Sequence, residues 1–402
     1  MAEAGVRPFW MAVHRYLGLA TLVFLALAAV TGCVLCVDKP LDAALNADLF
    51  RQPAGSAPLD ALQAVQALQA ARPDLTVLSF PAHVAAGDTV PVSVAAADPK
   101  HPLAYSEVFI DRADGHLAGT RLAGPGWDRR HIVLGIYTFH YTLLAGTAGR
   151  WLMGLCALGW LIGNLVGFYL TFPVRERFAS RGFWKKWSAL WTFRLKNPLP
   201  RLFLDLHRAS GLWLVVPATV LAFTSAAMNF FDEAFTPAVQ AVSPARPSPF
   251  DVPPPATAPP APAIGFAQAQ ALATQRAAAR GLAWKPARLS YAPDRGFYSV
   301  MLTPGGVETY SRLGPIDYAF DGAGRFVSED NPYSDSPGRK LSRALYPLHS
   351  GQVIGLPGVV LIFVLGLATA EMSVTGVYLW WKRRGPRIAG ERRLKALREA
   401  PQ

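Results

Sequence analysis

Four separate apolar stretches, each about 20 residues long, constrain this chain more than any other feature of its sequence. A helix must be apolar over roughly 20 residues to cross the ~30 Å hydrocarbon core of a bilayer. Of the four stretches, the third contains Pro217, and membrane helices tolerate an internal proline better than exposed helices do. The sequence therefore predicts four transmembrane helices, at residues 16–37, 151–172, 211–231 and 359–381.

The basic residues lie beside these stretches. The chain carries 39 Lys and Arg against 27 Asp and Glu, which gives a net charge of +12. Nine of the basic residues lie in 173–208 and eight in 382–402, two segments that four spans place on the same side as the N-terminus. Cytoplasmic loops of multi-pass proteins carry such an excess. We therefore expect membrane lipid and no nucleic acid as a partner, with both termini cytoplasmic and both long connecting segments outside.

The first stretch has an alternative interpretation as a signal peptide, because residues 30–33 (Val-Thr-Gly-Cys) resemble a lipoprotein cleavage site. We favour a retained helix, because its motifs recur later in the chain. The sequence His14-Arg15-x-x-Gly18 recurs as His207-Arg208-x-x-Gly211, and Thr31 recurs at the same offset of 193 as Thr224.

A second set of motifs recurs at an offset of 209. It relates His140 to His349, Gly149 to Gly358, and Gly167 to Gly376. The predicted fold class is an α-helical membrane protein in which four transmembrane helices form a parallel duplication (2+2), with two small α+β outer domains. Parallel repeats are related by an axis along the membrane normal.

The predicted order of segments alternates between membrane and solvent. Each outer segment has an Ala-rich helical stretch and ends in a strand–turn–strand pattern. The expected segments are a first transmembrane helix (1–37), an outer domain (38–128), an interfacial helix (129–149), a second transmembrane helix (150–172), a cytoplasmic loop (173–206), a third transmembrane helix (207–231), an outer domain with a Pro/Ala linker (232–338), an interfacial helix (339–358), a fourth transmembrane helix (359–381) and a cytoplasmic tail (382–402).

The four recurring histidines are the candidate binding residues. Parallel symmetry puts His14 and His207 at one depth near the cytoplasmic edge, and His140 and His349 at one depth near the outer edge. Two facing imidazoles can supply both axial ligands of a haem iron. The competing interpretations are polar groups at the interface, or a Zn or Cu site, for which no further ligand stands at a suitable spacing.

Six other residues are weaker candidates. Arg15 and Arg208 follow the histidines directly and suit either haem propionates or ordinary anchoring at the membrane surface. His131 is a spare ligand for the outer site. Cys33 and Cys36 have a redox spacing, although small core residues are the favoured interpretation. Glu371 lies within the fourth stretch, where an acid suits proton transfer, quinol contact or structural pairing.

These motifs, together with Gly376-Val-Tyr-Leu-Trp-Trp-Lys382, resemble the PepSY-associated transmembrane helix family of iron-regulated bacterial inner-membrane proteins, which includes FoxB-like ferrisiderophore reductases. The resemblance covers nearly the whole chain. It implies two outer domains of the PepSY type in the periplasm and two haem b groups with His14, His207, His140 and His349 as axial ligands. The implied activity is the reduction of ferric siderophores in the periplasm, with release of Fe(II).

The electron donor is expected to be quinol or a partner reductase, since no dinucleotide-binding motif follows a strand. Two other function classes compete with the reductase. One is a ligand-sensing or protease-inhibiting membrane module, because PepSY domains resemble protease propeptides. The other is a permease for a siderophore or haem, for which four spans make a thin pathway.

Overall fold

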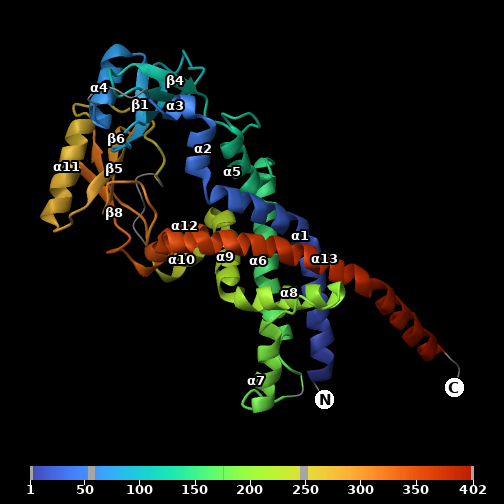
Figure 1. Cartoon of the computed structure of the whole chain (residues 1–402). Helices are drawn as coiled ribbons and strands as arrows, with labels where there is room; N and C mark the ends of the chain where they lie inside the picture. The colour runs from blue at the N-terminus through green and yellow to red at the C-terminus, as the bar shows by residue number, and fades with distance from the viewer. Residues whose placement is uncertain (1–2, 53–58, 175, 245–251, 400–402) are drawn as a thin grey trace.

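The chain forms a helical part and a sheet-bearing part (Figure 1). The structure is a computed structural model that describes residues 3–52, 59–174, 176–244 and 252–399. Arg175 of the predicted cytoplasmic loop and residues 400–402 of the predicted tail lie outside the described residues. The N-terminal end of α1 and the C-terminal end of α13 lie on the side of the helical part that faces away from the sheet (Figure 1).

Three helices are long and apolar enough to cross a membrane: α1 (Glu3–Leu35), α6 (Gly146–Leu170) and α13 (Leu356–Glu399). A fourth crossing exists within the described ranges only if two shorter helices, α8 (Leu199–Trp213) and α9 (Val215–Asn229), together form one span. These two helices meet at an angle of 71°. The helical part is therefore three long helices and one bent pair.

The predicted fold class, a 2+2 duplication of four transmembrane helices with two small α+β domains, is wrong. Pro217 has no N–H to donate to the carbonyl of Trp213, and its ring crowds that carbonyl. The helix breaks there, since α8 ends at Trp213. At the offset of 193 the first half has Phe24, and α1 runs on without a break. The two halves therefore differ in the very segment that the recurring motifs were expected to make alike.

The outer segments also differ from the prediction, because their strands form one antiparallel sheet. Its strand order is β4-β3-β2-β1-β5-β6-β7-β8. The strands are β1 (Leu75–Pro81), β2 (Val90–Ala96), β3 (Glu107–Ile110), β4 (Leu117–Arg121), β5 (Lys285–Ala292), β6 (Phe297–Thr303), β7 (Ile316–Asp321) and β8 (Phe326–Asp330). Two separate four-stranded sheets would each expose an extra edge of unpaired backbone groups, and pairing β1 with β5 removes both edges.

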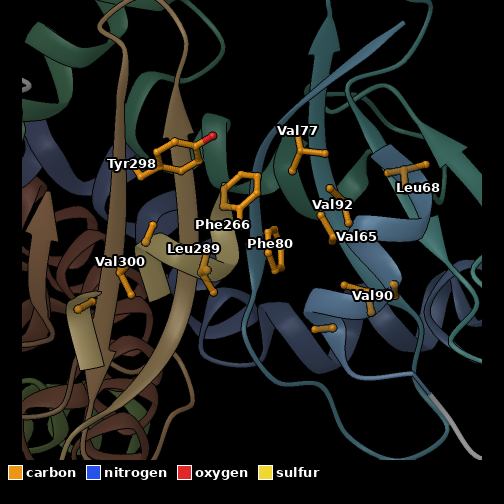
Figure 2. Packing of buried hydrophobic residues seen from close by; sticks show 14 of the residues in the cluster. Val65, Leu68, Val77, Phe80, Val90, Val92, Phe266, Leu289, Tyr298 and Val300 are labelled. Atoms are coloured by element: carbon orange, nitrogen blue, oxygen red, sulfur yellow. The ribbon is translucent and has the colours of Figure 1, made fainter. Parts of the chain in front are cut away.

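One hydrophobic core spans this junction. Phe80 of β1 and Phe266 of α11 (Phe266–Ala279) contact edge to face, with ring centres 5.0 Å apart. Leu289 of β5 lies opposite Phe80 in the register. Figure 2 shows these side chains beside Val65 of α4 (Ala61–Ala71), in a cluster that draws on both outer segments. The two segments are thus one structural unit.

Short helices lie in the connections between the longer elements. They are α2 (Asp38–Leu45), α3 (Ala47–Phe50), α5 (Ile132–Thr142), α7 (Arg181–Ser188), α10 (Thr236–Val242) and α12 (Pro337–Ser350), with single turns at Ala189–Trp191, Phe231–Phe235 and Gln352–Ile354.

Tight turns join α5 to α6 and α12 to α13. The residue after each short helix, Leu143 or Gly351, has a left-handed backbone. The following helix then passes so close that a Cβ on Gly149 would lie 1.7 Å from the carbonyl oxygen of Thr142. A Cβ on Gly358 would lie 1.9 Å from the carbonyl oxygen of Gly351. Glycine is therefore required at both positions, and these turns fix how α5 and α12 rest on the bundle.

Candidate functional site

The structure brings His14 and His207 together. His14 lies on α1 and His207 on α8, and their ring centres are 6.4 Å apart with the planes 76° from parallel. Nδ1 of His14 lies 3.0 Å from the carbonyl oxygen of Gly163 on α6. Nδ1 of His207 lies 3.2 Å from the carbonyl oxygen of Met372 on α13 and 3.2 Å from Oγ1 of Thr375. We call these two side chains the inner histidine pair.

The structure also brings His140 and His349 together. His140 of α5 and His349 of α12 have ring centres 6.2 Å apart and planes at 70°. Nδ1 of His140 lies 2.9 Å from Oγ1 of Thr31 on α1. Nδ1 of His349 lies 3.3 Å from Oγ1 of Thr224 and 3.4 Å from Oγ of Ser225, both on α9. We call these two side chains the outer histidine pair.

Burial keeps the outer pair uncharged. It lowers the pKa of His140 to about 4 and that of His349 to about 3, each from an ordinary value of 6.5. A neutral imidazole has one nitrogen that donates and one that accepts. The hydroxyls of Thr31 and Thr224 donate to carbonyls of their own helices, so each can accept a hydrogen bond from Nδ1–H, which leaves Nε2 as the lone-pair nitrogen. This is the tautomer that a metal-binding histidine uses when its other nitrogen is fixed by an outer partner.

Glycines on neighbouring helices make room for three of the four rings. A Cβ on Gly167 would lie 2.9 Å from Cε1 of His14, and a Cβ on Gly32 would lie 3.2 Å from Cε1 of His140. Gly376 stands opposite His207 in the same way, at 3.5 Å. The recurrence of Gly167 as Gly376 was the sequence signal for this role.

The geometry of both pairs fits a metal bound between two imidazoles. Metal–nitrogen bonds of about 2.0–2.1 Å, with each ring centre about 1.2 Å behind its nitrogen, would separate the centres of two rings on opposite sides of a metal by roughly 6.4–6.6 Å. The inner pair, at 6.4 Å, lies at the lower end of this range, and the outer pair, at 6.2 Å, lies slightly below it. Among the described residues, no three His, Cys, Asp or Glu side chains gather as a metal site. Two histidines without a third protein ligand could hold a metal whose other ligands come from a macrocycle such as haem.

The two arginines beside the inner pair have different surroundings. Arg208 forms an ion pair with Asp205 at 2.6 Å, and its Nε is buried without a partner. The guanidinium of Arg15 lies over the ring of Tyr16, 5.6 Å from its centre. Sequence reasoning missed Asp205, a buried carboxylate that also accepts hydrogen bonds from Asn197 and Arg201.

The weaker candidates are engaged elsewhere. Nδ1 of His131 contacts Asp128 at 2.6 Å and its Nε2 contacts the carbonyl of Leu122 at 3.0 Å, so neither nitrogen is left for a ligand. The free thiols of Cys33 and Cys36 point at carbonyls of α13, which makes them helix-packing residues. Both carboxyl oxygens of Glu371 are buried without a hydrogen-bond partner.

Fold and site together define a membrane protein with an extramembrane β-sheet and two buried histidine pairs. The chain belongs to the PepSY-associated TM region family, whose pattern matches residues 11–383. No curated protein matches the sequence.

Proposed function

We propose that this protein is a di-haem oxidoreductase of the bacterial inner membrane that moves electrons across the membrane to reduce ferric siderophores in the periplasm and release Fe(II). The observation that carries the proposal is the two histidine pairs, each with ring centres close to the separation of two imidazoles bound to one metal.

The two pairs stand far apart along one helix. His14 of the inner pair and Thr31, the partner of His140, both lie on the continuous helix α1. Seventeen residues at about 1.5 Å per residue separate their levels by roughly 25 Å, which is close to the ~30 Å hydrocarbon thickness. Two redox centres at these levels would serve the two faces of the membrane.

Haem, when bound, supplies the one-electron chemistry. The residues of this chain would hold the groups, orient them and keep water away. The carbonyls of Gly163 and Met372 and the hydroxyls of Thr31 and Thr224 fix the four rings. Arg15 and the unpartnered Nε of Arg208 are the candidate partners for propionates near the inner pair.

The distribution of basic residues supports the proposed orientation. The basic segment 173–208, the beginning of α1 and the end of α13 would be cytoplasmic, and the sheet periplasmic. The inner pair would then receive electrons from quinol or a partner reductase, and the outer pair would lie toward the ferric siderophore.

An absorption spectrum of protein purified from haem-replete cells tests the proposal. We expect dithionite to produce the bands of six-coordinate haem b, with two haems per chain. Replacing His140 or His349 by Ala should each remove the same haem and leave the other, and His14→Ala or His207→Ala should remove the second. His131→Ala is the control and should keep both.

Protein without haem would overturn the proposal. Siderophore uptake into proteoliposomes by such protein would then indicate a permease. Protease inhibition or ligand binding that is indifferent to the four histidines would indicate a regulatory module.

A further inference from the structure

A cavity of about 460 Å³ is lined mainly by the end of β6 and by residues 304–314, which follow that strand. Its walls include two aromatic rings, Trp284 and Tyr333, which meet edge to face with centres 5.4 Å apart. The hydroxyl of Tyr333 donates to the carbonyl of Gly314 at 2.9 Å, which fixes that ring. The wall also includes two residues with hydroxyl groups, Thr309 and Ser311.

Arg312 gives this cavity a positive charge. Its exposed guanidinium has no hydrogen-bond or ion-pair partner in the described part of the chain. The nearby acid Glu308 is already paired with Arg288 at 2.8 Å and does not neutralise Arg312. The backbone of Arg312 is left-handed, with φ at 59°, and its N–H donates to the carbonyl of Val353 at 3.0 Å. Unfavourable backbone conformations of this kind cluster at functional sites.

Two tyrosines connect the cavity wall to the outer pair. Tyr310, between Thr309 and Ser311, packs edge to face on Tyr346 of α12, with ring centres 5.0 Å apart. Tyr346 precedes His349 by three residues on that helix, so the two side chains are neighbours on one face. A ligand in the cavity would therefore be linked to the outer pair by two packed rings.

A second cavity, of about 320 Å³, does not share this chemistry. Its wall contains Asp38, Asp42 and Glu107. Its cations are already paired, Arg121 with Asp42 and Glu107, and Arg130 with Asp48. It offers no uncommitted positive charge to an anion.

We infer that the cavity beside Arg312 binds an anionic ferric chelate that carries aryl groups. The aromatic walls suit a planar ring, the guanidinium suits carboxylate or aryl oxygens, and the volume lies in the range of small-molecule sites. The inference rests on the proposed function, since it names the substrate class of that reductase.

Binding of a redox-inert analogue tests the inference separately from the reductase activity. Equilibrium dialysis of the full-length protein would measure binding of the anionic gallium(III) complex of 2,3-dihydroxybenzoate, with the cationic gallium(III) complex of desferrioxamine B as the comparison. We expect only the anionic complex to bind. Arg312→Asn, which suits a left-handed backbone, should weaken its binding about tenfold or more, because a charge-assisted contact is lost. Arg325→Asn removes an exposed arginine of the same sheet that pairs with Asp321, and should leave binding unchanged.

Equal binding of the two complexes, no binding of either, or unchanged affinity in Arg312→Asn would overturn the inference, even if the protein contains haem and reduces iron. Protein that lacks haem but shows Arg312-dependent binding would overturn the proposed function and leave this site standing.

Discussion

The hydroxyl of Thr31 lies 2.9 Å from Nδ1 of His140, while His349 of the same pair has two hydroxyl neighbours, Thr224 and Ser225, at 3.3 and 3.4 Å. Both rings of the outer pair thus contact hydroxyl groups through Nδ1, but His140 has one such partner and His349 has two. This difference allows the outer partners to be tested one at a time.

Thr31→Val should weaken haem retention at the outer site by about 10–100-fold, the usual effect of removing an outer partner from a metal-binding histidine. Thr224→Val should have a smaller effect, because Ser225 still reaches His349. The measurement is the rate of haem transfer to apomyoglobin, followed at the outer site in a His14→Ala background. Equal effects of both single variants would contradict the conclusion that Ser225 can replace Thr224 as the partner of His349.

Gly167→Ala should remove the inner haem and lower the haem-to-protein ratio from two to one. The added methyl would lie 2.9 Å from Cε1 of His14, so the ring must move. Gly385→Ala on α13 is the matched control, because its Cβ would meet nothing within 4 Å. We expect the control to keep both haems and to gain roughly 0.8–1.0 kcal/mol in helix propensity. Full haem content in Gly167→Ala would show that the ring tolerates displacement.

Part of the fold could be predicted from local sequence pattern. Apolar stretches of spanning length identified α1, α6 and α13, because such a stretch is recognised from consecutive residues of the sequence alone. Pro217 was visible, yet proline is compatible with a continuous span or a break, and the sequence pattern does not decide between them. The pairing of β1 with β5 joins Ser79 to Arg288, 209 residues away. The alternation of apolar and polar residues predicts a strand, but it does not predict which strand far away in the sequence will pair with it.

The candidate site was more accessible to sequence analysis than the fold. Recurrence alone proposed which histidines face each other, and the structure places those rings together. Thr31 and Gly167 also recurred, although their roles were not recognised. The carbonyls of Gly163 and Met372 gave no signal, because every residue has a carbonyl and only the packing shows which one a ring meets.

Tyr310→Leu should slow the reduction of a bound ferric chelate several-fold while leaving the affinity for its gallium analogue unchanged. The substitution removes the ring that packs on Tyr346 but no residue of the charged wall. Stopped-flow oxidation of the reduced protein by the chelate measures the rate. Tyr291→Leu, which changes a tyrosine elsewhere on the sheet, is the control. An unchanged rate would show that the two rings do not lie on the path.

Asp317 should make the sheet less stable as the pH rises. Burial raises the pKa of its carboxyl to about 7 from 3.8, against the opposing effect of Arg343, whose Nη2 lies 3.9 Å away. Asp330, Arg339 and Glu308 also face it. The folded state therefore keeps a proton that the unfolded state loses, and this stabilisation is complete below pH 3.8 and lost as the pH rises through about 7.

The pH dependence of the unfolding temperature checks this expectation. Asp317→Asn should flatten the decline between about pH 4 and 7, since the amide does not titrate. Asp98→Asn changes an exposed carboxylate and should leave the slope as it is. An unchanged slope in Asp317→Asn would mean that the carboxyl is already ionised across this range.

Glu371 should be needed for reduction by quinol but not by dithionite. Both of its carboxyl oxygens are buried without a partner, and its backbone carbonyl accepts a hydrogen bond from Thr375, whose hydroxyl lies 3.2 Å from Nδ1 of His207. A quinol that gives up electrons beside the inner pair must also release protons, and an unpaired carboxylate is a proton acceptor. Glu371→Gln should therefore slow quinol-driven reduction by about 10²-fold or more, the usual contribution of general acid–base catalysis. Asn164→Ala, at another side chain of the bundle with a buried polar atom that has no partner, should leave that rate unchanged. Wild-type quinol kinetics in Glu371→Gln would show that the carboxyl takes no part in proton transfer.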